Sequence, residues 1–153
     1  MNKGKNFSFV LPTRIEFGRG SLSKLPEVLV ELQVKKTLLV SDPGVRKAGI
    51  LEEVEKHLEG RGTGYEIFED VEANPNDRNV EAGARVLARM KADAIVAVGG
   101  GSPIDCAKAM AIVASHGGKA RDFEGKGKVN APVIPIVAVQ QRREQEAKLR
   151  SVR

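Results

Sequence analysis

Short apolar runs alternate with helical patterns from residue 37 onward, and this alternation restricts the fold more than any other feature. The runs are TLLVSD (37–42), YEIFED (65–70), AIVAVGG (94–100) and VIPIVAV (133–139). Three of them are almost continuously apolar, which is typical of parallel strands covered by helices on both faces. Strands that alternate with helices indicate βαβ units. The sequence therefore predicts one doubly wound α/β domain with a mostly parallel sheet.

The segments between these runs have helical periodicity. They are GVRKAGILEEVEKHLEG (44–60), NDRNVEAGARVLARMKA (76–92) and SPIDCAKAMAIVASHG (102–117). In the second, an apolar stripe recurs at helical spacing and consists of Val80, Ala84, Leu87 and Met90. Ahead of the first strand, residues 7–17 alternate enough for a hairpin or edge strands, and residues 21–33 predict a short helix.

Length and composition limit the class of protein. A chain of 153 residues has the size of one domain. The single cysteine, Cys106, excludes an internal disulfide and fits a reducing cytosol. The first residues show no signal peptide, and no apolar run reaches the length of a membrane helix. We therefore expect a cytoplasmic protein with no membrane segment.

The net charge of +5 is concentrated at the end of the chain. Residues 140–153 contain five Lys/Arg and two acidic residues and carry +3, so the other residues carry only +2. Aromatic residues do not interleave with the basic ones as stacking platforms would. We expect no nucleic-acid binding.

The stretch VAVGGGSPIDCAKAM (96–110) carries the most functional information. Gly99, Gly100 and Gly101 separate a strand from a helix that Ser102 opens. Glycines let the backbone approach an anion, and free N–H groups at a helix start point toward it, so a diphosphate would fit. The alternative is a tight strand–helix turn with no ligand, because short glycine-rich turns are common.

The residues after these glycines predict how the helix begins. Pro103 suits the first helical position, and Ser102 and Asp105 have the spacing of a capping box. In the ligand-free alternative, Asp105 merely supports this cap.

Two further loops follow strands, at the edge where open α/β sheets bind ligands. Asp42 closes the first strand, where a carboxylate can accept both hydroxyls of an adenosine ribose and repel a 2′-phosphate. It is at least as compatible with a helix N-cap before Pro43. Asn74 can contact an adenine edge, but Asn-Pro is also a turn-forming pair.

Four segments resemble the N-terminal domain of the iron-containing alcohol dehydrogenases. They are PTRIEFGRGSL, VSDPG, NPN and GGGSPIDCAKAMAI, in this order and spacing, and the resemblance runs from Phe9 to Val139. It implies a Rossmann-like fold and a bound nicotinamide dinucleotide, with NAD favoured over NADP by the Asp42 charge.

The resemblance also implies roles for single residues. Gly100, Gly101, Ser102 and Asp105 would bind the diphosphate and the nearby ribose, and Gly99 belongs to the same cofactor-binding set. Asp42 would hold the adenosine ribose, and Asn74 would lie near the adenine. Lys108 matches the lysine of the motif and either approaches phosphate or pairs with a carboxylate.

In the family, iron or zinc polarises a small alcohol or aldehyde, and a C-terminal helical domain holds the metal through one aspartate and three histidines. None of those positions exists in this chain, and its histidines, His57 and His116, lack metal-site spacing. We expect no bound metal and an NAD-binding half-enzyme that is inactive alone. The alternative is a non-enzymatic binding module whose basic tail recruits a partner. An exposed sheet edge would permit homo-oligomers.

Residues 140–153 differ from the domain at residues 1–139. The family continues here with the loop PTTAGTGSEVT, and the codons for this tail, read one base earlier, permit that loop at all eleven positions. The expectation is a frameshift near codon 139 and a tail that is a frayed helix or disordered, since it lacks an apolar face. The nucleotide sequence around codon 139 tests this.

Overall fold

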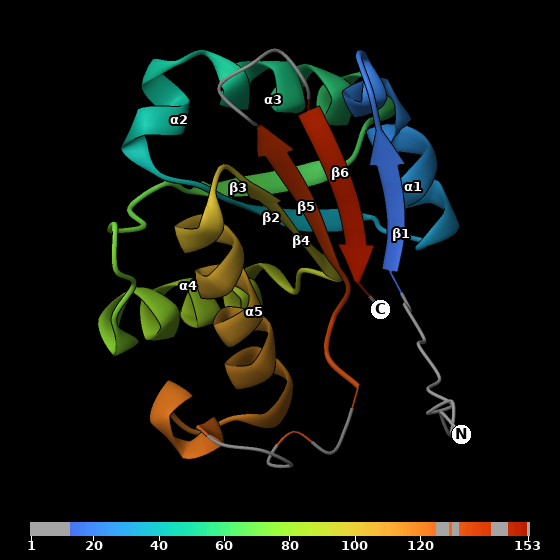
Figure 1. The fold of residues 1–153 in the computed structure, drawn as a ribbon. Coiled ribbons are helices and arrows are strands. Elements are labelled where there is room, and N and C mark those ends of the chain that lie inside the picture. Colours follow the sequence, from blue (N-terminus) through green and yellow to red (C-terminus); the bar gives the residue numbers. More distant parts are fainter. Residues whose placement is uncertain (1–12, 125–128, 130–131, 142–146, 153) are drawn as a thin grey trace, which may run out of the picture.

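Six strands form one sheet in the computed structural model, which describes residues 13–124, 129, 132–141 and 147–152 (Figure 1). The strands are β1 (Thr13–Phe17), β2 (Lys36–Val40), β3 (Gly64–Phe68), β4 (Ala94–Val98), β5 (Ile136–Gln141) and β6 (Ala147–Val152). Their order is β1-β6-β5-β4-β2-β3. Strands β5, β4, β2 and β3 are parallel, whereas β6 runs antiparallel to both β5 and β1. The predicted mostly parallel α/β sheet is confirmed.

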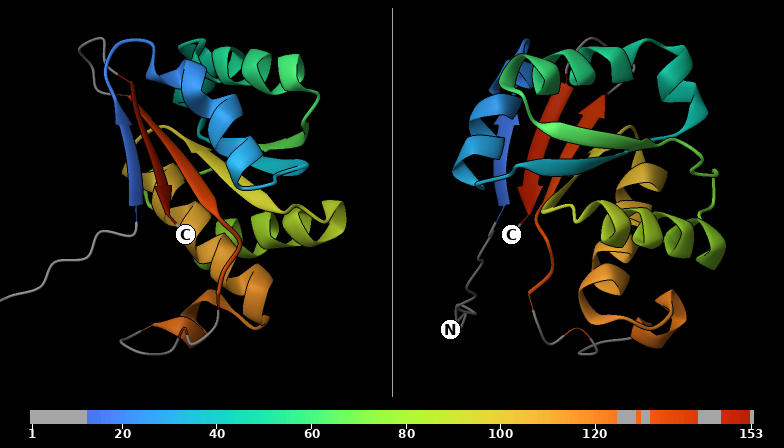
Figure 2. Two further views of the ribbon diagram at one scale, coloured as in Figure 1. Left: turned by 90° about the vertical axis from the view of Figure 1, so that its right-hand side faces the viewer. Right: turned by 180° about the vertical axis from the view of Figure 1, so that it is seen from behind.

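Helices cover both faces of the parallel strands. They are η1 (Ser21–Lys24), α1 (Leu25–Glu31), α2 (Pro43–Lys47), α3 (Ile50–Arg61), α4 (Asp77–Met90), α5 (Gly101–His116) and η2 (Ala120–Phe123). Helices α1 and α3 lie on one face, and α4 and α5 lie on the other (Figures 1 and 2). Among the described helices, none has both the length and the apolar character that crossing a bilayer requires.

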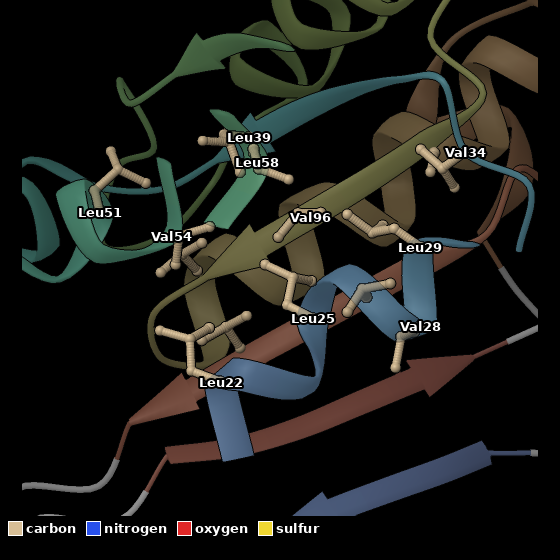
Figure 3. Packing of buried hydrophobic residues seen from close by; sticks show 14 residues of the cluster. Leu22, Leu25, Val28, Leu29, Val34, Leu39, Leu51, Val54, Leu58 and Val96 are labelled. Atoms are coloured by element: carbon tan, nitrogen blue, oxygen red, sulfur yellow. The ribbon is translucent and has the colours of Figure 1, made fainter. Parts of the chain in front are cut away.

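Alternation along the strands divides the core into two clusters. Leu39 and Val96 pack with α1 and α3, as Figure 3 shows, and the adjacent Leu38 and Ile95 pack with α4 and α5. The predicted stripe of α4 is confirmed, because Val80, Ala84 and Leu87 are buried and Met90 is half-buried in the second cluster. Burial on both faces explains why these strands are nearly continuous in apolar residues.

The winding direction of the chain reverses between β2 and β4. From β2 the chain continues through α3 to β3 at the edge of the sheet. From β3 it returns through α4, on the opposite face, to β4 on the other side of β2. The loops after β2 and β4 therefore diverge to opposite faces, and such a reversal leaves a crevice at the carboxyl ends of the strands.

Several predicted boundaries differ from the observed ones. The helix expected at residues 44–60 is two helices, because Gly49 takes a left-handed conformation (φ 76°) between α2 and α3. The helix expected at residues 21–33 is the pair η1 and α1. The strand expected at residues 133–139 is shifted to Ile136–Gln141. In residues 7–17 the described part is β1, and residues 7–12 lie outside the described residues.

The expectation of a frayed helix or disorder after residue 140 is wrong for residues 147–152. These residues form β6, in which Leu149 pairs with Val139 of β5 and with Glu16 of β1. Strand β5 otherwise has an open edge on this side, and unpaired N–H and C=O groups there favour the addition of a strand. Residues 142–146 and 153 lie outside the described residues.

Candidate functional site

A pocket of about 380 Å³ lies where the loops after β2, β3 and β4 meet. It is lined by Asp42, Pro43, Val71, Glu72, Ala73 and Ser102. Its volume lies within the range of small-molecule sites. The fold thus brings two predicted residues, Asp42 and Ser102, to one cavity at the carboxyl ends of the parallel strands.

Hydrogen bonds hold these three loops together. The Ser41 hydroxyl, which is buried, donates to the carbonyl of Val98 at 2.9 Å, and the Ser41 N–H donates to the carbonyl of Phe68 at 2.9 Å. The Ser102 hydroxyl donates to the carbonyl of Ala73 at 2.6 Å. Sequence reasoning missed Ser41; the available signal was a polar residue directly after an apolar run.

Gly99 occupies the most crowded position of the glycine loop. Its φ is 136°, and a Cβ atom there would lie 3.0 Å from both Pro103 Cγ and Val45 Cγ2 and 3.4 Å from Asp42 Oδ2. A side chain at this position would therefore be strained and would collide with the neighbouring loop. Gly100 and Gly101 differ, because they are exposed and a Cβ atom on either would meet nothing within 4 Å.

The helix after this loop begins with an open N-terminus. Helix α5 starts at Gly101, one residue earlier than expected, and no side chain in the described part of the chain caps Gly100. The predicted capping box of Ser102 and Asp105 is wrong, since the Ser102 hydroxyl bonds to Ala73 instead. Pro103 accordingly occupies the third helical position, not the first. The N–H groups of the first turn remain available to an anion, and no acidic residue lies in that turn to compete for them.

Asp42 is the N-cap of α2. Its Oδ1 accepts a hydrogen bond from the Val45 N–H at 3.0 Å, which confirms the N-cap interpretation. A carboxylate has about four acceptor positions, so this cap leaves capacity for ribose hydroxyls. The other oxygen, Oδ2, is the one that lies toward Gly99. Asp42 therefore stands between the N-terminus of α2 and the glycine loop.

The other predicted residues do not line this pocket: they are the three glycines of the loop and Asn74, Asp105 and Lys108. Lys108 Nζ lies 3.2 Å from Asp105 Oδ1, and both side chains are more than half exposed on α5. These two residues line a different hollow of about 260 Å³ that includes Phe123. This ion pair agrees with the alternative that Lys108 pairs with a carboxylate and does not approach a phosphate. Asn74 is exposed and directly follows Ala73, at the rim of the first pocket.

Within the described part of the chain, Cys106 and His116 have structural surroundings and no metal-binding neighbours. Cys106 is buried, and burial raises the pKa of its thiol to about 11, so it is a packing residue. His116 Nδ1 lies 3.1 Å from the carbonyl of Ile112, and its ring packs edge-on against Phe123. Among the residues that the structure describes, no group of three or more His, Cys, Asp and Glu residues could hold a metal ion.

Known proteins match this chain over most of its length. The family model for iron-containing alcohol dehydrogenase matches residues 12–140. The 1,3-propanediol dehydrogenase of Klebsiella pneumoniae is 40% identical over 135 residues, covering 87% of this chain and 35% of that protein. The NAD-dependent methanol dehydrogenase of Bacillus methanolicus is 36% identical over 132 residues, covering 86% of this chain and 35% of that protein.

Solved structures agree with these sequence matches. The NADH-dependent butanol dehydrogenase A of Thermotoga maritima superposes with a TM-score of 0.82 at 34% identity, covering 88% of this chain and 34% of that one. The chain thus spans about a third of the length of these relatives. The matched region includes the glycine loop and all three loops that form the pocket. The chain belongs to the iron-containing alcohol dehydrogenase family.

Proposed function

We propose that this chain is the NAD-binding part of an iron-containing alcohol dehydrogenase. The observation that carries the proposal is the convergence of Asp42, Ser102 and the open N-terminus of α5 around one pocket. The names of two relatives, a methanol dehydrogenase that is NAD-dependent and a butanol dehydrogenase that is NADH-dependent, support the choice of cofactor. The same family implies that a small alcohol or aldehyde is the substrate of a full-length enzyme.

Each group has a distinct part in the proposed binding. The free N–H groups of Gly101 and Ser102 would hold the diphosphate, with Gly99 and Gly100 allowing it to approach. Asp42 would accept the hydroxyls of the adenosine ribose, and Asn74 at the rim would lie near the adenine. Asp105 and Lys108, which lie further along α5, would contact only the part of the dinucleotide beyond the diphosphate.

The described residues do not fit the metal of the family, because no suitable ligand cluster is present among them. We therefore propose that this chain alone does not oxidise alcohols. The backbone of β6 pairs with both β5 and β1. This pairing favours a structural part for residues 147–152 over the alternative of a free, partner-binding tail.

Isothermal titration calorimetry with NADH tests the proposal. We expect a dissociation constant on the order of high micromolar to millimolar and weaker binding of NADPH. Gly100→Val should abolish binding, because a branched side chain would occupy the place of the diphosphate. It should not unfold the chain, because a Cβ atom at this position enters open space in the free protein. Gly60→Val adds the same side chain at another open position, on α3, and should bind normally. Binding unaffected by Gly100→Val would remove the glycine loop from the site.

A further inference from the structure

A cluster of four charged residues lies beside the loops that form the pocket. Arg46 Nε donates to Glu69 Oε2 at 2.6 Å, and Arg46 Nη1 donates to Glu55 Oε1 at 2.7 Å and to Glu52 Oε1 at 3.2 Å. We call these residues the Arg46 cluster. One cation meets three carboxylates, so the cluster carries a net charge of −2, and both Nε and Nη1 of Arg46 donate within it. These carboxylates raise the pKa of Arg46, Glu69 most strongly, so the guanidinium stays charged.

The Arg46 cluster is connected to two of the loops that form the pocket. Arg46 lies one helical turn from Asp42, and its N–H donates to the Asp42 carbonyl at 3.3 Å. Glu69 is two residues from Val71, which lines the pocket, and the Val71 N–H lies 3.4 Å from the Ser41 carbonyl. The cluster therefore joins the two loops that carry Asp42 and Val71, within about 10 Å of the cavity.

The charges that face the pocket have one sign. Its described lining contains two carboxylates, Asp42 and Glu72, and no Lys or Arg. The cation that lies one turn from Asp42 is held by three glutamates. A ligand with a 2′-phosphate, which adds a charge of about −1.5 to −2, would meet this negative field without a compensating cation.

We propose that the net charge of the Arg46 cluster, together with Asp42, sets the preference of this pocket for a dinucleotide without a 2′-phosphate. The inference rests on the proposed dinucleotide binding and adds Arg46 and Glu69 as specificity-determining residues. The cluster lies about 10 Å from the cavity, and the effective dielectric constant between them lies between those of the protein surface and water. Without salt screening, a change of one unit of charge in the cluster therefore changes the affinity for NADPH relative to that for NADH roughly three- to tenfold.

The test measures the ratio of the NADPH and NADH dissociation constants at an ionic strength of about 0.15 M, where screening acts over about 8 Å. Because screening at this ionic strength removes most of the unscreened effect, Glu69→Gln should lower this ratio by up to about twofold, and Arg46→Met should raise it by a similar factor. The double variant has the wild-type net charge and should return near the wild-type ratio. Arg46→Lys keeps the charge and should leave the ratio unchanged.

A second arginine supplies the matched control. Arg14 also contacts three glutamates, at 2.7 Å (Glu16), 3.5 Å (Glu27) and 2.5 Å (Glu31). Its strand, β1, is separated from β2 by β6, β5 and β4, which places it about 19 Å away. Glu31→Gln and Arg14→Met should therefore leave the ratio unchanged.

The outcomes separate this inference from the proposal on which it rests. If the wild-type chain binds neither dinucleotide, both fail. If it binds NADH but Glu69→Gln leaves the ratio unchanged, or Glu31→Gln moves it equally, only the inference is overturned. The affinity of Glu69→Gln for NADH should not fall; a fall would indicate that Asp42 has been displaced, and it would also overturn the charge effect. Circular dichroism of each variant identifies any that fail to fold, and Glu69→Gln and Arg46→Lys then decide the result.

Discussion

The parallel part of the sheet and its antiparallel edge use the same type of backbone hydrogen bond but differ in everything that surrounds them. Strands β2 and β4 are covered on both faces, and β4 is buried throughout. In β1, Ile15 is 44% exposed, and Arg14 pairs with glutamates at the surface. The pocket lined by Asp42 and Ser102 lies in the parallel part, because there the strands end in loops that start helices and the winding direction reverses.

The largest expected difference between the two parts concerns side-chain packing. Leu39→Ala removes a fully buried side chain in β2 and should lower the free energy of unfolding by about 2–5 kcal/mol. Ile15→Ala, in β1, should change it by no more than about 0.5 kcal/mol, since that side chain is already partly in water. Urea unfolding measures both. Equal losses would mean that β1 is as much a part of the core as β2.

A smaller effect is expected from breaking the pairing of β6. Leu149→Pro removes an N–H from a strand that lies between β5 and β1, which should cost about 1–3 kcal/mol. Hydrogen exchange should accelerate in β1 and β6 and remain slow in β2 and β4. Leu149→Val retains the N–H and serves as the control. Unchanged exchange in β1 would contradict the pairing of β6 with that strand.

The smallest effect appears at the opposite edge of the sheet, at high pH. The Tyr65 hydroxyl of β3 donates to Glu59 Oε1 at 2.8 Å, and this bond, with some burial, raises the pKa of Tyr65 from 10.0 to about 12. The fold thus favours the neutral phenol. This contribution is complete below pH 10.0 and is lost as the pH rises toward about 12. Tyr65→Phe should abolish this part of the alkaline loss of stability, measured by thermal unfolding at a series of pH values; an identical loss in the variant would contradict it.

Sequence patterns were informative in the parallel part and indicated the edge strand β1, but they missed β6. Continuous apolar runs identified β2 and β4, because burial on both faces demands such residues. The strand at Ala147–Val152 was missed, because its pairing depends on the open edges of β5 and β1 and not on its own composition. The boundary proposed at residues 139/140 and the frameshift expected there stay predictions.

The site was predicted unevenly for a similar reason. Gly99, Asp42 and Ser102 lie within four residues of the ends of β4 and β2, so sequence order alone placed them at one edge of the sheet. The sequence did not indicate that Ser102 bonds to Ala73, because that partner comes from a loop far away along the chain. Asp105 and Lys108 matched a motif but pair with each other on the exposed side of α5.

By itself, the sequence determined the fold class and the glycine loop, because these depend on local periodicity, residue size and backbone freedom, and the order of four motifs identified the family by resemblance. Only the tertiary structure decided which loops share a pocket, where β6 pairs and which charges stand behind Asp42. Glu69 and Arg46 are separated by 23 positions, and the ion pair between them exists because β2 and β3 are neighbours in the sheet. Contacts of this kind depend on strand order, which no local pattern in the chain encodes.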